Sequence, residues 1–219
     1  MNKLVLSKPT LIMLYGFPGA GKTHFSRQLS DAVSIAHVSG DRIRFELFEK
    51  PHYDKQENDV VNHLMEYMTE EFLQAGVSVI YDDNAMRLSQ RRALRDMARK
   101  AHAQPVLIWI QIDPDSAQVR LSGRDKRKAD DKYAADYDKH GFETYSGHMQ
   151  NPRNEDYIVI SGKHTFNTQK SAVVKKLYDL GLLSADNATT KVVKPGLVNL
   201  VPNMAAGRVD MTRRNIVIR

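Results

Sequence analysis

A glycine-rich segment at residues 16–23 combines the residue types that bind a chain of phosphates. Its sequence, GFPGAGKT, fits the phosphate-binding pattern G-x-x-x-x-G-K-[ST], between an apolar run and a segment of helical spacing. Glycines let successive backbone N–H groups turn toward phosphate oxygens, at the positive end of a helix dipole. We therefore expect a nucleotide-binding loop that contains Gly16, Pro18, Gly19, Ala20 and Gly21.

Lys22 and Thr23 end this segment with a charge and a metal ligand. Lys22 can reach the β and γ phosphates of ATP as a mobile point charge, and the hydroxyl of Thr23 can bind Mg²⁺. The alternative is a glycine turn that binds nothing, which the apolar run before the segment and the helical spacing after it disfavour. The two residues therefore predict ATP and Mg²⁺ as cofactors.

Asp41 and Arg44 form a second chemically active pair, after the second apolar run of the chain. Three positions apart on a helix, their side chains share one face, which we expect to point into a cleft. At the carboxyl end of a strand, a carboxylate can accept the proton of an attacking hydroxyl, and a guanidinium can hold an anionic acceptor bidentately. The alternative, a helix cap with a surface ion pair, is the commoner role of an isolated D-x-x-R sequence. Their position relative to the glycine-rich segment favours catalysis.

Acidic residues also follow the third apolar run. Asp82, Asp83 and Asn84 stand where a phosphate-loop protein needs a carboxylate to order the water shell of Mg²⁺. We assign this role to Asp82. For Asp83 and Asn84, a helix cap or an Asx turn explains the sequence equally well.

These residues need a scaffold, and the chain alternates short apolar runs with longer segments of helical spacing. The candidate strands are residues 11–15, 34–38, 77–81, 105–112 and 157–160. The candidate helices are residues 23–33, 41–48, 59–75, 89–103 and 168–182. Strands without polar alternation are typical of parallel sheets covered on both faces. The pattern predicts an α/β sandwich of three layers at residues 1–183.

A polar segment at residues 124–148 interrupts this alternation. Its many Lys, Asp and Tyr residues and two glycines are typical of a mobile lid. Arg120, Arg124 and Arg127 lie where a helix gives way to this segment, so one or two of them could close over the γ phosphate. We favour Arg124 and then Arg120, while for each the alternative is a solvated basic helix end.

Taken together, these motifs resemble those of the polynucleotide kinase-like group of P-loop kinases, with the zeta-toxin kinases as more distant relatives. The likeness spans about residues 10–182 and rests on residues 16–23, Asp41 with Arg44, and residues 81–84 followed by Arg91 and Arg92. It implies a five-stranded parallel sheet, transfer of the ATP γ-phosphoryl group to a hydroxyl, and an arginine-bearing lid. It also implies that Asp41 is the general base, that Arg44 contacts the acceptor or the transferring phosphate, and that Lys22 with Thr23 grips the nucleotide.

The composition limits the remaining classes of function. The 219 residues include no cysteine, which excludes disulfides and thiolate metal sites and fits a reducing compartment, so we expect a cytoplasmic protein. The apolar run at residues 11–15 is too short for a signal-peptide core or a membrane span, and no membrane partner is expected.

The net charge of +6 is concentrated in residues 184–219, which hold six Lys or Arg against two Asp. Apolar residues alternate at 197–201 and 208–218, with turn residues between them, which predicts a β-hairpin. Such an extension could contact nucleic acid or a protein, although a structural hairpin is the default.

The sequence therefore predicts an ATP-dependent kinase with Mg²⁺ as cofactor. It leaves open whether the acceptor is a nucleic-acid end, a nucleoside or another small molecule. The alternative is an ATP-binding switch or slow ATPase that phosphorylates nothing and whose lid and basic tail engage a partner.

Overall fold

The structure is a computed structural model that describes residues 3–128 and 131–183. The β-hairpin expected at residues 184–219, and the contacts expected of that segment, lie outside the described residues. The division of the chain into a kinase domain at residues 1–183 and a basic extension therefore stays a prediction.

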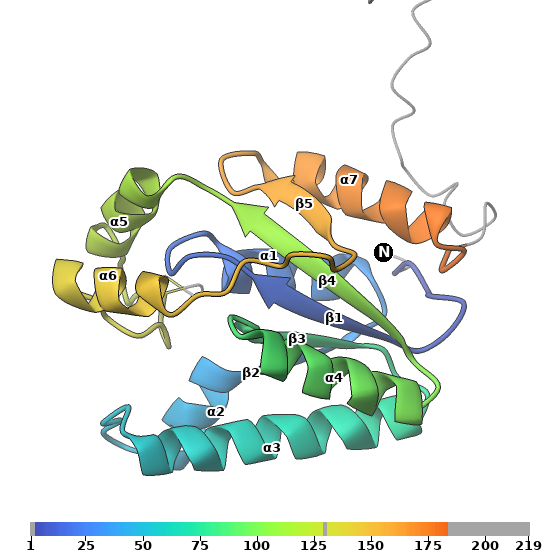
Figure 1. Cartoon of the computed structure of the whole chain (residues 1–219), viewed down its shortest axis with the longest axis horizontal. Helices are drawn as coiled ribbons and strands as arrows, with labels where there is room; N and C mark the ends of the chain where they lie inside the picture. Colours follow the sequence, from blue (N-terminus) through green and yellow to red (C-terminus); the bar gives the residue numbers. More distant parts are fainter. Residues whose placement is uncertain (1–2, 129–130, 184–219) are drawn as a thin grey trace, which may run out of the picture.

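A sheet of five strands forms the centre of the described part of the chain (Figure 1). The strands are β1 (Thr10–Tyr15), β2 (Ala36–Ser39), β3 (Val79–Asn84), β4 (Gln104–Gln111) and β5 (Ile158–Ser161). They lie in the order β2-β3-β1-β4-β5, and all neighbours are parallel. The predicted five-stranded parallel sheet is confirmed. The central strand, β1, is buried along its whole length, so the segment that follows it starts from a fixed position.

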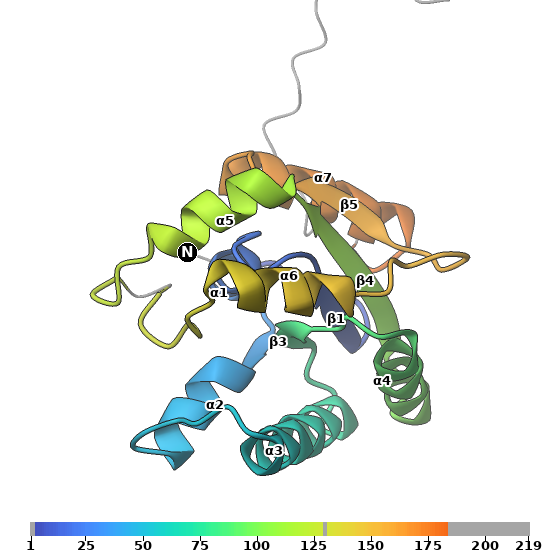
Figure 2. The same ribbon diagram turned by 60° about the vertical axis from the view of Figure 1, so that its left-hand side comes forward.

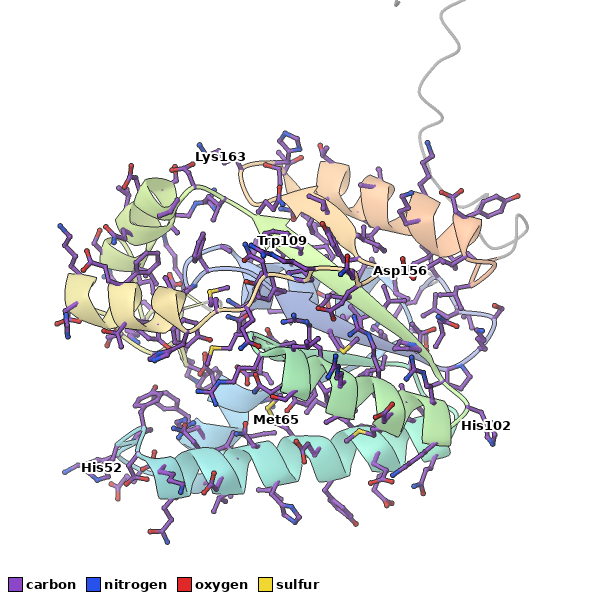
Figure 3. All side chains as sticks on the ribbon, in the orientation of Figure 1. His52, Met65, His102, Trp109, Asp156 and Lys163 are labelled. Carbon is purple, nitrogen blue, oxygen red and sulfur yellow. The ribbon has the colours of Figure 1, made fainter. Side chains whose placement is uncertain are left out.

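Helices cover both faces of the sheet, which confirms the three-layer sandwich (Figure 1). On one face, α1 (Lys22–Ala32) and α7 (Phe166–Asp179) enclose a core with Phe25 and Val173 fully buried. On the other face, α3 (Lys55–Gln74) and α4 (Leu88–Lys100) enclose a second core. Met65 belongs to this second core and extends from α3 toward the sheet (Figure 3). The apolar stripe of each helix is thus used for packing, as its sequence spacing predicts.

The carboxyl ends of the strands are surrounded by α2 (Gly40–Leu47), α5 (Pro114–Ser122) and α6 (Lys139–Gly147) (Figure 2). The sequence predicts a lid at residues 124–148, without a helix at the position of α6. The helix forms because the side chain of Asp138 accepts a hydrogen bond from the backbone N–H of Gly141 at 2.6 Å, which caps it. Phe142 then anchors α6 by burying its ring beside Ala117 and Leu121 of α5.

α3 begins at Lys55, earlier than the predicted residue 59. The side chain of Asp54 accepts a hydrogen bond from the backbone N–H of Glu57 at 2.9 Å, so it caps the helix before the apolar stripe begins. Apolar periodicity alone therefore placed the start of the helix too late. Within the described ranges, no helix is both long and apolar enough to cross a membrane.

Candidate active site

Residues 16–21, here called the phosphate loop, connect β1 to α1 and owe their shape to two glycines. Gly19 and Gly21 have φ angles of 81° and 95°, a left-handed conformation that residues with a Cβ rarely adopt. A Cβ on Gly19 would also collide with the backbone carbonyl oxygen of Ala117. A Cβ on Gly21, by contrast, would meet no other atom within 4 Å, so its left-handed backbone alone favours glycine there. This shape fits a chain of phosphates.

Lys22, the first residue of α1, folds back over the phosphate loop. Its Nζ donates hydrogen bonds to the carbonyl oxygens of Gly16 at 3.0 Å and Phe17 at 3.1 Å. Burial lowers the pKa of Lys22 to about 8, against the opposing effect of the carboxylates of Asp83, Asp82 and Asp41. A phosphate bound in the loop would give the ammonium group a close anionic partner, so the side chain is poised to bind one.

Thr23 and Asp82, the two residues predicted to hold Mg²⁺, lie side by side. The hydroxyl of Thr23 donates to Oδ1 of Asp82 at 3.4 Å, and Asp82 is buried at the end of β3. A hydroxyl and a carboxylate oxygen are hard ligands, and Mg²⁺ needs only one or two of them beside phosphate and water oxygens. The residues present therefore fit this metal.

His37 of β2 joins the same group, although no sequence motif indicates it. Its Nε2 lies 2.8 Å from Oδ2 of Asp82, which leaves the other carboxylate oxygen toward Thr23. His37 thus helps to fix the orientation of Asp82. Since its partner is on a neighbouring strand, 45 positions away, only the strand register reveals it.

Asp41, the predicted base, lies at the first turn of α2 and faces the same cavity as Lys22. Burial raises the pKa of Asp41 to about 6, and the neighbouring carboxylates of Asp83 and Asp82 add to the effect, while Arg124 and Lys22 oppose it. Burial also raises the pKa of Asp83. A carboxylate with a pKa near neutrality is suited to accept a proton from a hydroxyl.

Arg44 faces the cavity from the next turn of α2, but its guanidinium already has partners. Nη1 donates to Oε2 of Glu57 at 3.0 Å, Nη2 donates to the side-chain oxygen of Asn58, and the ring of Tyr53 lies 4.7 Å from Cζ. The expected bidentate grip on an anionic acceptor would use the same two nitrogens. A D-x-x-E sequence at Asp54 and Glu57 is the sequence signal that could have revealed this arrangement.

The two favoured lid arginines, Arg124 and Arg120, both line the cavity. Arg124 donates to the carbonyl oxygen of Ala135, and its Nε lies 3.9 Å from Oδ1 of Asp131, so contacts within the lid hold it. Arg120 instead donates to the carbonyl oxygen of Gly162 at 2.9 Å, in the connection between β5 and α7. Both guanidinium groups therefore line the same cavity as the phosphate loop. Contacts within the lid hold that of Arg124, and the connection between β5 and α7 holds that of Arg120.

The cavity that contains these residues has a volume of about 1410 Å³ and lies at the carboxyl end of the sheet. Its walls come from the phosphate loop, α2, α3, the end of β3 and the lid. Ligand sites in α/β sheets occupy this end of the strands. The volume exceeds that of a typical small-molecule site, which leaves space for a second molecule beside a nucleotide.

Tyr145 and Asn84 connect α6 to the phosphate loop. The amide nitrogen of Asn84 donates to the hydroxyl of Tyr145 at 3.1 Å, and its amide oxygen accepts from the backbone N–H of Gly16 at 3.2 Å. The ring of Phe17 also packs against that of Phe142, at 5.9 Å between centroids. The position of α6 is thus coupled to the loop that would hold the phosphates.

Arg91 is the largest fully buried side chain in the described residues. Arginines recur at positions 87, 91, 95 and 99, and such a regular row is typical of a solvated helix face. Arg91 bonds to the carboxylate of Glu155, which also receives Arg95, and its Nη1 donates to the carbonyl oxygen of Ala85 at 2.8 Å. The ring of Tyr15, at the end of β1, lies 5.4 Å from its Cζ. Arg91 therefore supports the strand that leads into the phosphate loop.

Comparison with known proteins agrees with this geometry. A family model described as an AAA domain matches residues 11–152, which include the phosphate loop, α2 and the end of β3. The chain belongs to this AAA domain family.

Relatives of this AAA domain protein include proteins described as kinases. A probable adenylyl-sulfate kinase from Pyrococcus abyssi (strain GE5 / Orsay) is 25% identical over 179 residues, which cover 78% of this chain and 97% of that protein. Among solved structures, Chaetomium thermophilum Kti12 in complex with ADP-AlF3 has a TM-score of 0.60 and 16% identity, covering 80% of this chain and 99% of that one. A gluconokinase from Sinorhizobium meliloti 1021 has a TM-score of 0.57 and 16% identity, covering 82% and 95%. The predicted P-loop kinase family is confirmed.

Proposed function

We propose that this AAA domain protein is an ATP-dependent kinase that transfers the γ-phosphoryl group to a hydroxyl. The observation that carries the proposal is the position of Asp41: the carboxylate faces the same cavity as Lys22 and the phosphate loop, and its pKa is raised to about 6. A site that only binds ATP has no need of a base at this place.

In the proposed reaction, the acceptor oxygen attacks the γ-phosphorus while Asp41 takes its proton. The bond between the γ-phosphorus and the β–γ bridging oxygen breaks, and ADP leaves. Lys22 donates N–H groups to the phosphate oxygens, and Arg124 and Arg120 neutralise charge that develops on the transferring group.

The expected metal has a defined place in this scheme. Thr23 and Asp82 would hold Mg²⁺, directly or through water, with His37 orienting Asp82. When bound, the ion neutralises part of the charge on the phosphates. A cytoplasmic location stays a prediction.

Labelled ATP and replacement of the base test the proposal. We expect Asp41→Asn to bind ATP as tightly as the unaltered protein and to lose at least about 100-fold in transfer to any acceptor found in a screen of nucleosides, sugars and nucleic-acid ends. Asp31→Asn, which alters an exposed carboxylate on α1, should retain full transfer. Full transfer by Asp41→Asn would remove Asp41 from the mechanism. ATP hydrolysis by the unaltered protein without transfer would favour the switch instead.

A further inference from the structure

Glu57 neutralises the charge of Arg44 in the wall of the cavity. The two side chains are both buried, and Nη1 of Arg44 lies 3.0 Å from Oε2 of Glu57. Burial by itself would raise the pKa of Glu57, yet hydrogen bonds from the backbone N–H groups of His52 and Tyr53 and from Arg44 keep it below its ordinary value. At neutral pH the carboxylate is ionised, so Arg44 and Glu57 have no net charge together.

The same carboxylate holds Tyr53 in an unusual conformation. Tyr53 has a φ of 58°, a left-handed backbone that a bulky residue rarely adopts, and the hydrogen bond from its N–H to Glu57 is 2.9 Å long. Its ring covers the guanidinium of Arg44 and lines the cavity. Backbone strain of this kind persists where surrounding contacts enforce it, and it collects at ligand sites.

Arg44 retains one hydrogen-bond donor, Nε, for a ligand. Its Nε is buried and has no hydrogen-bond partner among the described residues, whereas Nη1 and Nη2 are engaged by Glu57 and Asn58. An unpartnered buried donor costs free energy unless a ligand or water accepts from it. Arg44 therefore presents a hydrogen-bond donor without a surplus positive charge.

The charges around this end of the cavity disfavour an anion. Asp41, Asp83 and Glu57 supply three carboxylates, and Arg44 balances one of them. Lys22 and Arg124 also act on Asp41, but the proposed kinase function uses both of these cations for the phosphates of ATP. The uncharged part of the nearby wall consists of Tyr53, Asn58, Asn62, Met65, Tyr137 and Tyr145. Lys55 and Arg87 also line the cavity, but both are exposed and belong to the first residues of α3 and the residue before α4. A phosphate close to the reacting hydroxyl would meet like charges.

We propose that the acceptor is an uncharged sugar ring with free hydroxyl groups, alone or as part of a nucleoside, and that Glu57 determines this specificity by neutralising Arg44. The inference rests on the proposed kinase function and identifies the class of its substrate. One ring hydroxyl faces Asp41, Nε of Arg44 donates to a second ring oxygen, and the side-chain amide of Asn62 is available to others. The aromatic ring of Tyr53 packs against the apolar face of the sugar or base.

Matched probes with and without phosphate test this proposal. Adenosine is compared with its 3′- and 5′-monophosphates, and glucose with glucose 1-phosphate, because each phosphorylated probe keeps a free hydroxyl. Binding to the full chain is measured by calorimetry, with saturating Mg²⁺ and a non-hydrolysable ATP analogue, and transfer is measured from labelled ATP. We expect at least one uncharged probe to bind at least about tenfold more tightly than its phosphorylated counterpart and to accept phosphate.

Glu57→Gln should reduce this preference about tenfold or more, because Arg44 then carries an unbalanced charge. Glu66→Gln, on the exposed side of the same helix, should leave it unchanged. If Glu57→Gln does not fold, the comparison of the matched probes on the unaltered protein still tests the proposal. Equal or tighter binding of the phosphorylated probes, or binding of none of the uncharged ones, would overturn the proposal. Transfer to phosphorylated probes alone would overturn it while sustaining the kinase, whereas failure to bind the ATP analogue would overturn both.

Discussion

Nη2 of Arg91 lies 2.7 Å from Oε1 of Glu155, although 64 positions separate the two residues. Their side chains are 1% and 7% exposed, so this ion pair is inside the protein. Arg91 belongs to α4, and Glu155 belongs to the segment that returns from α6 to β5. The pair therefore fastens the return from the lid to the helix that supports the end of β1.

Removing the carboxylate should destabilise the fold. Glu155→Ala leaves the buried guanidinium of Arg91 without its acidic partner and frees Arg95, and breaking a buried pair in this way costs about 3–5 kcal/mol. Chemical denaturation followed by circular dichroism measures the change in the free energy of unfolding.

A matched surface pair supplies the control for this experiment. Arg99 and Asp96 bond at 2.9 Å on the same helix, but their side chains are 65% and 63% exposed. Asp96→Ala should cost less than about 1 kcal/mol, because water screens the pair. Similar costs for the two variants would contradict the structural role given to Glu155.

Asp41→Asn should stabilise the protein above neutral pH. Burial, and then the charges of Asp83 and Asp82, raise the pKa of Asp41 from 3.8 to about 6. The native state therefore binds the carboxyl proton of Asp41 more tightly than the unfolded state does. The free energy of unfolding of the protein consequently falls as the pH rises from about 4 to about 6. Since Asp41 is partly exposed, we expect a gain of about 1–2 kcal/mol at pH 7.5 and a smaller gain at pH 4. Urea denaturation at both values measures it, and a loss of stability at pH 7.5 would contradict the raised pKa.

Transfer activity should fall at acidic pH. Asp41 must be ionised to accept a proton, so kcat/KM should decrease as the pH falls through about 6. Initial rates between pH 5 and pH 8 at saturating Mg²⁺, with thermal melting at each pH to verify the fold, give the profile. A rate that stays constant from pH 5 to pH 7 would argue against Asp41 as the base.

ATP binding should be coupled to proton uptake near pH 8. Burial lowers the pKa of Lys22 to about 8, and bound phosphates would raise it again, so the affinity for ATP should fall as the pH rises above about 8. Calorimetry in two buffers of different ionisation enthalpy counts the protons. Lys22→Met should abolish the uptake, whereas Lys100→Met, at the end of α4, should not change it. Uptake that persists in Lys22→Met would assign the proton to another group.

Local sequence signals predicted the parts of the site that are continuous in the chain. The phosphate loop depends on two glycines and on the strand before it, and all of these are neighbours in sequence. Asp41 follows β2 and Asp82 lies at the end of β3, and the carboxyl ends of parallel strands meet at one edge, so their presence in the same cavity could be expected. The apolar runs predicted the parallel sheet, because strands that helices cover on both faces lack polar alternation.

Pairs that depend on strand register or on loop geometry could not be found this way. His37 of β2 contacts Asp82 on the neighbouring strand, β3. Glu155, which contacts Arg91, lies 64 positions away in the return from the lid. Arg91 looks like a solvated residue in its own helix, because the acid that buries it lies far along the chain. α6 was missed because its apolar contribution is one buried side chain, Phe142, in an otherwise polar segment.

Trp109, the single tryptophan of the chain, lies on β4 (Figure 3). Its ring meets that of Tyr15 at 5.4 Å between centroids and that of Tyr157 at 5.5 Å. Tyr15 is the last residue before the phosphate loop, and its hydroxyl donates to the side-chain oxygen of Asn151 at 2.7 Å, in the return from the lid. The single tryptophan therefore lies one aromatic ring away from the phosphate loop, and its emission offers a label-free signal for the binding of a nucleotide.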